Sequence, residues 1–178
     1  DHLDRYDYDM SKYALAKFRI TENQSSEDLL ILNKDDQESM KYFGKIQTNA
    51  QVIYTSTAEI NEETFTSNKG ITYDISECNL RGRHNQSNIA QAIEALESIG
   101  LKKRAVESGI STFQGLAHRL EFVANVDGVD YINDSKATNI DSVWYALDAM
   151  KKPIVWIVGG IDKGNDYSIL SELVRNKV

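Results

Sequence analysis

Apolar side chains recur along this chain with two periods, which predicts a mixture of helices and strands. Apolar residues at helical spacing predict helices over residues 10–20, 37–42, 85–99, 105–109, 140–150 and 167–175. Short apolar runs predict strands over residues 28–32, 51–54 and 154–158, and a hairpin over residues 65–74. The combination predicts a fold of the α/β class.

The run at 154–158, Ile-Val-Trp-Ile-Val, contains no polar side chain. Such runs are typical of a central parallel strand that is covered on both faces. Pro153 can open this strand, and Gly159-Gly160 can end it before the helix at 167–175. We therefore expect the second part of the chain to alternate strand and helix in an open sheet, with a domain boundary near Gln114-Gly115.

A second hairpin, over residues 119–133, is followed by a polar segment that leads into the helix at 140–150. Asp127-Gly128 is a preferred type I′ turn sequence. A helix start offers unpaired N–H groups and partial positive charge, so Lys136 would complete an anion site there. Asp134 could hold a hydroxyl or an ammonium group.

The alternative for this polar segment is a simple helix cap. Asp134, Ser135 or Thr138 could each accept a hydrogen bond from the first turn of the helix. Taken together with the other motifs, the six residues 134–139 favour the anion site.

The first five residues, Asp-His-Leu-Asp-Arg, place His2 between two carboxylates. This grouping suits a divalent cation or a metal-bound phosphate, and the alternative is a polar loop. Lys17, on the helix at 10–20, has the pattern of an ordinary solvated lysine.

Residues 80–88 are basic and lead into the helix at 85–99. Asn85 and Asn88 are three residues apart, so they share one helix face. Paired amides can present a donor and an acceptor to a planar base such as adenine. The alternative is an N-cap together with an exposed asparagine.

Two further motifs offer cations. Arg119 follows His118 at the proposed boundary and could bind a phosphate through two parallel hydrogen bonds, the alternative being a surface salt bridge. Lys163 follows the apolar run at 154–158, where open α/β sheets bind ligands. Its alternative is an ordinary strand-to-helix turn.

Composition and charge argue against several classes of partner and location. The chain has 178 residues, is 41% hydrophobic and carries a formal charge of −7, which argues against nucleic-acid or anionic-membrane partners. Cys78 is the one cysteine, so no disulfide can form within the chain. It contains no apolar run of about 18 residues, so we expect no membrane insertion. Because it begins at Asp1 in what reads as the middle of a motif, we expect a fragment.

Taken in their order along the chain, these motifs resemble those of the Mur ligases of peptidoglycan synthesis. The resemblance extends over nearly all of the chain. The resemblance is carried by Asp1–Arg5, Tyr13–Lys17, Gly82–Asn88, His118–Glu121, Asn133–Asn139 and Gly159–Lys163. It implies that residues 1–114 are the later part of the central ATPase domain. It also implies that residues 115–178 are the first half of a Rossmann-like C-terminal ligand-binding domain.

The activity implied by the resemblance is that of an ATP-dependent acid–amino-acid ligase. ATP would phosphorylate the carboxylate of UDP-N-acetylmuramoyl-L-alanine, and the amine of D-glutamate would attack the acyl phosphate. ATP and Mg²⁺ are the implied cofactors. A cytoplasmic monomer with no nucleic-acid partner and no membrane insertion is the implied form.

The resemblance also assigns roles to residues. His2 and a carbamylated Lys17 would bind metal. Asn85 and Asn88 would lie at the adenine, and His118, Arg119 and Asp134 would contact the rest of the nucleotide. Lys136, Thr138 and Lys163 would lie near D-glutamate, and the implied catalytic lysines are Lys17, Lys136 and Lys163.

One family motif is missing. The phosphate cradle has the form Gly-x-x-Gly-Lys-Ser/Thr, whereas this chain has Gly44-Lys45-Ile46. We therefore expect the chain alone to be inactive. Three alternatives remain: a folate polyglutamate-type ligase, a non-catalytic nucleotide- or amino-acid-binding module, and a structural domain without a ligand.

Overall fold

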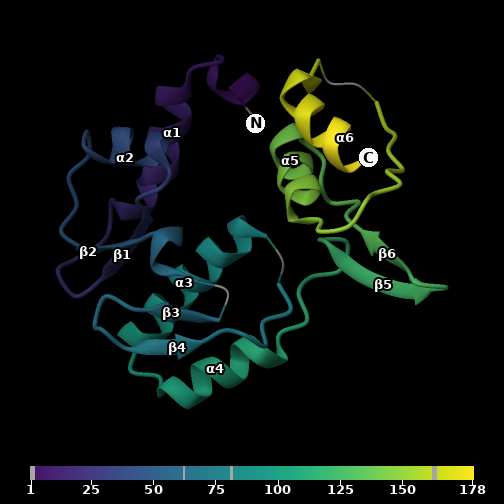
Figure 1. Cartoon of the computed structure of the whole chain (residues 1–178). Helices are drawn as coiled ribbons and strands as arrows, with labels where there is room; N and C mark the ends of the chain where they lie inside the picture. Colours follow the sequence, from purple (N-terminus) through teal and green to yellow (C-terminus); the bar gives the residue numbers. More distant parts are fainter. Residues whose placement is uncertain (1–2, 62, 81, 162–163) are drawn as a thin grey trace. The chain divides into compact units, whose positions relative to one another are not determined.

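The computed structural model describes residues 3–61, 63–80, 82–161 and 164–178, with the main chain alone for Arg83. It forms two compact units, drawn in Figure 1. The first unit contains Asp1–Cys78 and Gln86–Phe113, and the second contains Asn79–Asn85 and Gln114–Val178. Both helices and strands are present, as the α/β class requires.

The first half of the first unit is built around a parallel strand pair. Its elements are η1 (Leu3–Tyr6), α1 (Met10–Phe18), η2 (Arg19–Thr21), β1 (Leu29–Asn33), α2 (Gln37–Phe43), β2 (Gln51–Thr55) and η3 (Thr57–Glu59). The β1 and β2 strands run parallel, with Leu30 opposite Val52. Leu30 and Leu32 point to the same side of β1 and are buried, as the period of two in a strand requires.

Asp35, in the turn after β1, ties the carboxyl ends of this strand pair together. Its carboxylate accepts hydrogen bonds from Ser56 Oγ at 2.7 Å, from Thr57 N at 2.7 Å and from Thr57 Oγ1 at 2.9 Å. These bonds, that from Ser56 first, hold the pKa of Asp35 below its ordinary value. The Asp35 carboxylate therefore links the turn after β1 to the segment that follows β2.

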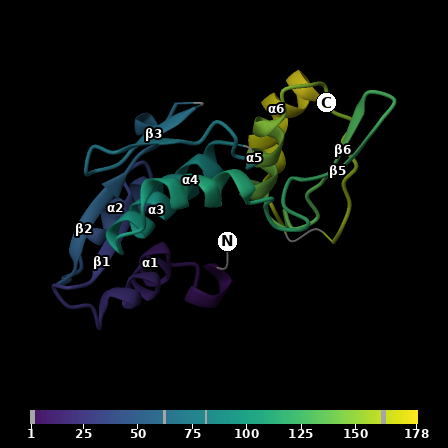
Figure 2. The same ribbon diagram turned by 90° about the horizontal axis from the view of Figure 1, so that it is seen from below.

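The second half of the first unit packs an antiparallel hairpin beside two helices (Figure 2). These elements are β3 (Thr64–Thr66), β4 (Thr72–Asp74), α3 (Arg83–Ser98) and α4 (Lys103–Thr112). The side chains of Phe65 and Tyr73 are fully buried and lie opposite each other in the hairpin. The helix predicted at 105–109 is longer than expected, since α4 begins two residues earlier and ends three residues later.

Two buried glutamates of α3 hold this hairpin. Glu94 Oε1 accepts from Asn68 N at 2.7 Å and from Asn68 Nδ2 at 2.9 Å. Glu97 Oε2 accepts from the hydroxyl of Tyr73 at 3.0 Å. Hydrogen-bonded partners make carboxylates tolerable in a core.

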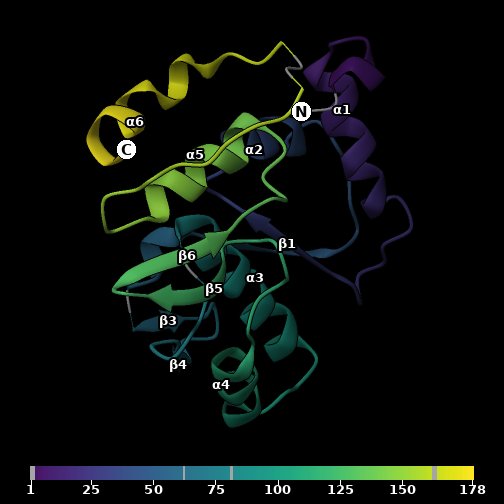
Figure 3. The same ribbon diagram turned by 90° about the vertical axis from the view of Figure 1, so that its right-hand side faces the viewer.

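The second unit contains one hairpin and the last helices of the chain. Its elements are β5 (Glu121–Val126), β6 (Val129–Asn133), α5 (Ile140–Ala149), η4 (Tyr167–Leu170) and α6 (Ser171–Lys177), best seen in Figure 3. Asp127 has φ 50° and Gly128 has φ 83°, which confirms the predicted type I′ turn. Leu147 of α5 and Leu170 of η4 form the buried centre.

A lysine of α6 binds the end of α5. The ammonium of Lys177 donates to the carbonyls of Leu147, Asp148 and Met150 at 2.9, 2.6 and 2.9 Å. The last carbonyls of a helix have no partner within the helix, and they carry partial negative charge. Lys177 supplies both the donors and the opposite charge.

The strand predicted at 154–158 does not form, so that prediction is wrong. No strand of the described residues pairs with this segment, and the N–H of Ile154 donates instead to the carbonyl of Lys177 at 2.6 Å. Val155 and Ile157 are each 93% exposed. A strand exists only where a neighbour accepts its main-chain hydrogen bonds, so composition alone could not make one here.

For the same reason, the open sheet expected in the second part of the chain is not present among the described residues, where that unit holds only the antiparallel pair β5–β6. In the described part of the chain, none of the helices is both long and apolar enough to cross a bilayer.

Candidate functional site

Arg119 lies in a turn with unusual backbone geometry at the start of the β5–β6 hairpin. His118 before it has φ 66° and Leu120 after it has φ 46°. Both values are in the left-handed region, which is unfavourable for residues that carry a Cβ atom. A conformation of this kind persists only where the surrounding structure holds it, and it often marks a functional position.

Hydrogen bonds hold both sides of this turn. Glu121 Oε2 accepts from His118 N at 2.8 Å, and Asp134 Oδ1 accepts from Leu120 N at 3.1 Å. The N–H of Lys136 donates to the carbonyl of His118 at 3.1 Å. The structure therefore brings His118, Arg119, Asp134 and Lys136 together, although Arg119 and Lys136 are 17 residues apart in sequence.

Asp134 is half-buried, and this environment shifts the pKa of its carboxyl group. Burial raises the pKa of its carboxyl group, while the Leu120 N–H, His84 and Arg119 act in the opposite direction. The carboxyl group has thus lost part of its water and lies within range of the charges of His84 and Arg119. It suits a hydroxyl donor such as a sugar.

His84 is a site residue that the motif analysis did not select. Its ring packs on Tyr145, and burial lowers the pKa of the imidazole, with the charge of Asp134 opposing that shift. Nδ1 is buried without a hydrogen-bond partner among the described residues. His84 is part of the basic motif at 80–88, so the sequence did point to its neighbourhood. Only the fold reveals that it interacts with Asp134, fifty positions further along the sequence.

Gly82 makes room for that imidazole. A Cβ atom at this position would lie 3.0 Å from His84 Cε1 and 3.2 Å from the Cβ atom of Ala149. Gly82 also has φ 90°, which favours glycine. Two independent reasons therefore require glycine here.

The N-cap of α5 is Asn139, whose Oδ1 accepts from Ser142 N at 2.8 Å. The alternative that Asp134, Ser135 or Thr138 caps this helix is therefore wrong. Lys136 and Thr138 are exposed in the segment before the helix, where their side chains can meet solvent or a ligand.

Asn85 and Asn88 both lie in α3, which places them on one helix face as predicted. The structure groups Asn85 with the second unit and Asn88 with the first. Asn85 is half-buried and Asn88 is exposed. Their assignment to an adenine site stays a prediction.

The predicted metal ligands are only partly described. The predicted metal ligand His2 lies outside the described residues, as does Lys163, which is predicted to bind substrate rather than metal. Lys17 is exposed on α1, with its Nζ 5.5 Å from the centre of the Tyr13 ring. Within the described ranges, no group of three or more His, Cys, Asp or Glu side chains could hold a metal ion. The described residues alone therefore do not form a Mg²⁺ site.

The second unit thus offers a cluster of mixed charge. Arg119 and Lys136 are cations that can bind phosphate or carboxylate oxygens, and Asp134 can accept from a hydroxyl group. This combination suits a ligand that carries both anionic and hydroxyl groups. A nucleotide has both.

Comparison with known proteins gives consistent results. Residues 1–96 match the family model described as the Mur ligase middle domain. The chain is 42% identical over 189 residues to the UDP-N-acetylmuramoylalanine--D-glutamate ligase of Cytophaga hutchinsonii. It is 43% identical to the protein of that name from Bacteroides fragilis and 39% identical to that from Christiangramia forsetii. These matches cover 99–100% of this chain but only 42% of the length of each relative.

Proposed function

The chain belongs to the Mur ligase family, and from this premise we propose that it is part of an ATP-dependent ligase of peptidoglycan synthesis. The reaction would join D-glutamate to UDP-N-acetylmuramoyl-L-alanine. The observation that carries this proposal is the clamped Arg119 turn, in which Asp134 holds Leu120 N and the Lys136 N–H binds the carbonyl of His118. The names of the relatives support the choice of substrates.

We propose that residues 1–114 belong to the central ATP-binding domain and residues 115–178 to the first half of a Rossmann-like C-terminal domain. The family match over residues 1–96 supports the first assignment. The grouping of Gln114–Val178 in a compact unit separate from Gln86–Phe113 supports the second. A cytoplasmic location and a monomeric state are part of the same proposal.

In the proposed reaction, the γ-phosphoryl group of ATP passes to the L-alanine carboxylate, giving an acyl phosphate and ADP. The amine of D-glutamate then attacks the acyl carbon, loses a proton, and inorganic phosphate leaves. Arg119 would offset phosphate charge and Asp134 would accept from the ribose. Asn85, Asn88 and His118 would complete the nucleotide contacts.

We assign Lys136, Thr138 and Lys163 to D-glutamate, because cations and a hydroxyl group suit its two carboxylates. Lys17 and His2 would be the protein's ligands to Mg²⁺, which would neutralise charge on the phosphate oxygens. Carbamylation would give Lys17 the oxygen ligands that Mg²⁺ prefers.

A non-catalytic binding module is the second candidate. Gly44 ends α2 as its C-cap, whereas a phosphate cradle requires the start of a helix. Gly44-Lys45 therefore cannot replace the missing cradle. For this reason we expect the chain alone to give no turnover, even where the protein that contains it is active.

The test is phosphate release by the full-length protein with ATP, UDP-N-acetylmuramoyl-L-alanine and either D- or L-glutamate. Turnover with the D form alone is expected. Turnover with L-glutamate and a folate acceptor would favour the folate-type ligase, and nucleotide binding without turnover would favour the binding module. A rate of ADP formation by the 178-residue chain itself that depends on both substrates would contradict its expected inactivity.

A further inference from the structure

We infer that Glu121 and Asn133 are positioning residues that fix the main chain of Arg119 for binding of the nucleotide phosphates. This inference rests on the proposed function, because it takes Arg119 as a nucleotide contact. Neither residue has a role in the proposed chemistry. Their contacts with the turn around Arg119 are the basis for the assignment.

The turn needs external support. His118 and Leu120, on the two sides of Arg119, have φ values of 66° and 46°. Left-handed backbone is disfavoured for both residue types, so a relaxed chain would leave this conformation and move the guanidinium with it. Bonds that hold the two flanking N–H groups therefore hold Arg119.

The hairpin supplies these bonds from a fixed position. Glu121, at the start of β5, lies opposite Asn133, at the end of β6. A single oxygen of Glu121, Oε2, accepts from His118 N at 2.8 Å and from Asn133 Nδ2 at 3.2 Å. Asn133 Nδ2 also lies 2.8 Å from His118 Nδ1. Both residues thus contact the left-handed residue that precedes Arg119.

The next residue of β6 completes the clamp. Asp134 accepts from Leu120 N at 3.1 Å, so consecutive residues at the strand end hold the two sides of Arg119. A ligand that meets an arginine whose main chain is already held in place loses less affinity to the ordering of the protein. The positioning pair would therefore improve nucleotide affinity without touching the nucleotide.

The test uses three variants of the full-length protein: Glu121→Ala, Glu121→Gln and the control Glu172→Ala, an exposed glutamate of α6. The dissociation constant of a non-hydrolysable ATP analogue is measured by calorimetry. Glu121→Ala should weaken binding about tenfold, the effect expected when hydrogen bonds to a binding group are lost. Glu121→Gln keeps an acceptor oxygen and should stay within about twofold of the parent. Glu172→Ala should match the parent.

Hydrogen exchange of the peptide spanning residues 116–122, measured without nucleotide, provides a readout that does not depend on the proposed function. Glu121→Ala should exchange faster there, and Glu121→Gln should not. Faster exchange with unchanged affinity would overturn the inference while leaving the proposed function intact. Equal loss of affinity in the Ala and Gln variants would also overturn it, because charge rather than positioning would then matter. A parent protein that binds no nucleotide would overturn the proposed function, and the inference with it.

Discussion

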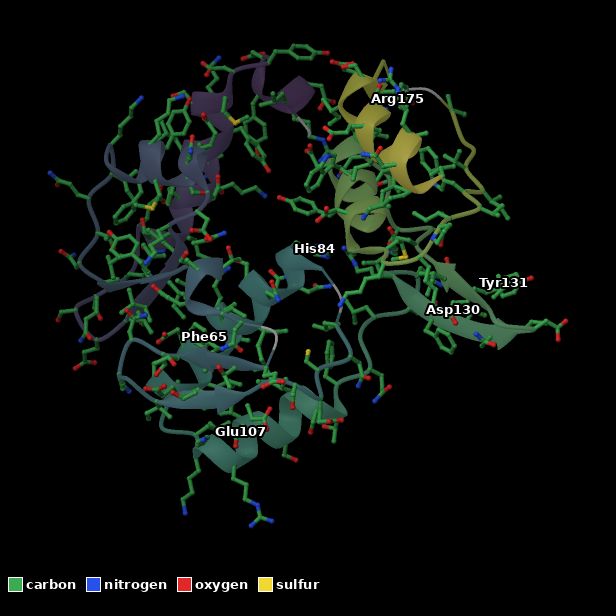
Figure 4. All side chains as sticks on the ribbon, in the orientation of Figure 1. Phe65, His84, Glu107, Asp130, Tyr131 and Arg175 are labelled. Atoms are coloured by element: carbon green, nitrogen blue, oxygen red, sulfur yellow. The ribbon has the colours of Figure 1, made fainter. Side chains whose placement is uncertain are left out.

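The imidazole of His84 packs on the ring of Tyr145, with ring centres 5.2 Å apart and planes inclined by 55°. His84 lies in the first turn of α3, in the part of that helix that belongs to the second unit. Tyr145 lies in α5 of the same unit. Their packing fixes the imidazole near Asp134, the carboxylate that we assign to the nucleotide. Figure 4 shows His84 at the start of α3.

Asp134→Asn should lower the pKa of His84 further. Burial already places that pKa below the ordinary value of 6.5, and the negative charge of Asp134 partly opposes the shift. Removing the charge leaves burial alone. The measurement is an NMR titration of the His84 ring protons in parent and variant, with Asp141→Asn, an exposed carboxylate on α5, as control. A higher His84 pKa in Asp134→Asn would contradict the assigned interaction.

The lowered pKa of His84 predicts how the stability of the second unit depends on pH. Because the folded pKa of His84 is depressed, the unfolded chain binds more protons below pH 6.5. This contribution to the free energy of unfolding is complete above pH 6.5 and is lost as the pH falls through the folded pKa. Denaturant unfolding between pH 5 and 7.5 should show the loss in the parent, and His84→Gln should reduce it. An identical slope in the variant would contradict the prediction.

Gly82→Ala should destabilise the second unit more than Gly128→Ala does. Both glycines have left-handed φ values, 90° and 83°, so each alanine incurs a backbone cost of about 1–2 kcal/mol. Only at Gly82 would the new Cβ atom meet neighbours, the nearest being His84 Cε1 at 3.0 Å. Gly82→Ala should therefore lower the free energy of unfolding by about 1 kcal/mol more than Gly128→Ala does, as measured by denaturant unfolding. Equal losses would show that the contact relaxes without cost.

Lys177→Met should destabilise the contact between α5 and α6 by about 2 kcal/mol, because three carbonyls at the end of α5 lose a charged donor. Methionine keeps most of the side-chain length, so the change is mainly in charge and hydrogen bonding. Lys151→Met, at an exposed lysine near the same helix end, is the control. Thermal unfolding of both variants tests the prediction. Similar melting temperatures would contradict it.

Tyr73→Phe should lower the free energy of unfolding of the first unit by about 2 kcal/mol, since the buried carboxylate of Glu97 loses the hydroxyl donor at 3.0 Å. Burial, followed by the bond to Glu97, raises the pKa of Tyr73 to about 12. Because the pKa of Tyr73 is raised in the folded state, the contribution of its neutral hydroxyl group to the free energy of unfolding is present below pH 10. That contribution is lost as the pH approaches 12. Absorbance titration of the phenols tests whether Tyr73 ionises at a raised pH. The control is Tyr131→Phe, at an exposed tyrosine.

Lys17→Ala in the full-length protein should abolish ligase activity, and short carboxylates such as acetate should restore part of it. The added carboxylate would take the place of the carbamate oxygens. Lys12→Ala, an exposed lysine on the same helix that pairs with Asp7 at 2.7 Å, should keep activity and is the control. Unchanged activity in Lys17→Ala would remove its role as a metal ligand.

Elements that depend on local sequence could be predicted, and the structure confirms them. The type I′ turn at Asp127-Gly128 is fixed by the conformational preferences of its own two residues. The helix α1 was likewise predicted from its own apolar spacing. The alternative that Asp134, Ser135 or Thr138 caps α5 arose because several polar residues precede that helix, and only the structure shows that Asn139 bonds its first turn.

Features that depend on distant residues could not be predicted. The strand at 154–158 required a neighbour that no local pattern specifies. The interaction of His84 with Asp134 and the clamp of the Arg119 turn by Glu121 both depend on how the hairpin folds back. The structure brings the motif residues His118, Arg119, Asp134 and Lys136 together, and the residues that support them are visible only in three dimensions.

The bare segment 154–158 has implications for handling the chain in solution. The five apolar residues of this run, of which Val155 and Ile157 are each 93% exposed, have the high β-propensity and lack of charge that favour cross-β stacking. Lys151, Lys152 and Pro153 immediately precede it, and charges and proline beside such a run act as gatekeepers that oppose stacking. We therefore expect these three residues to oppose aggregation of the isolated chain, and we expect salt to weaken their effect because it screens the two lysine charges.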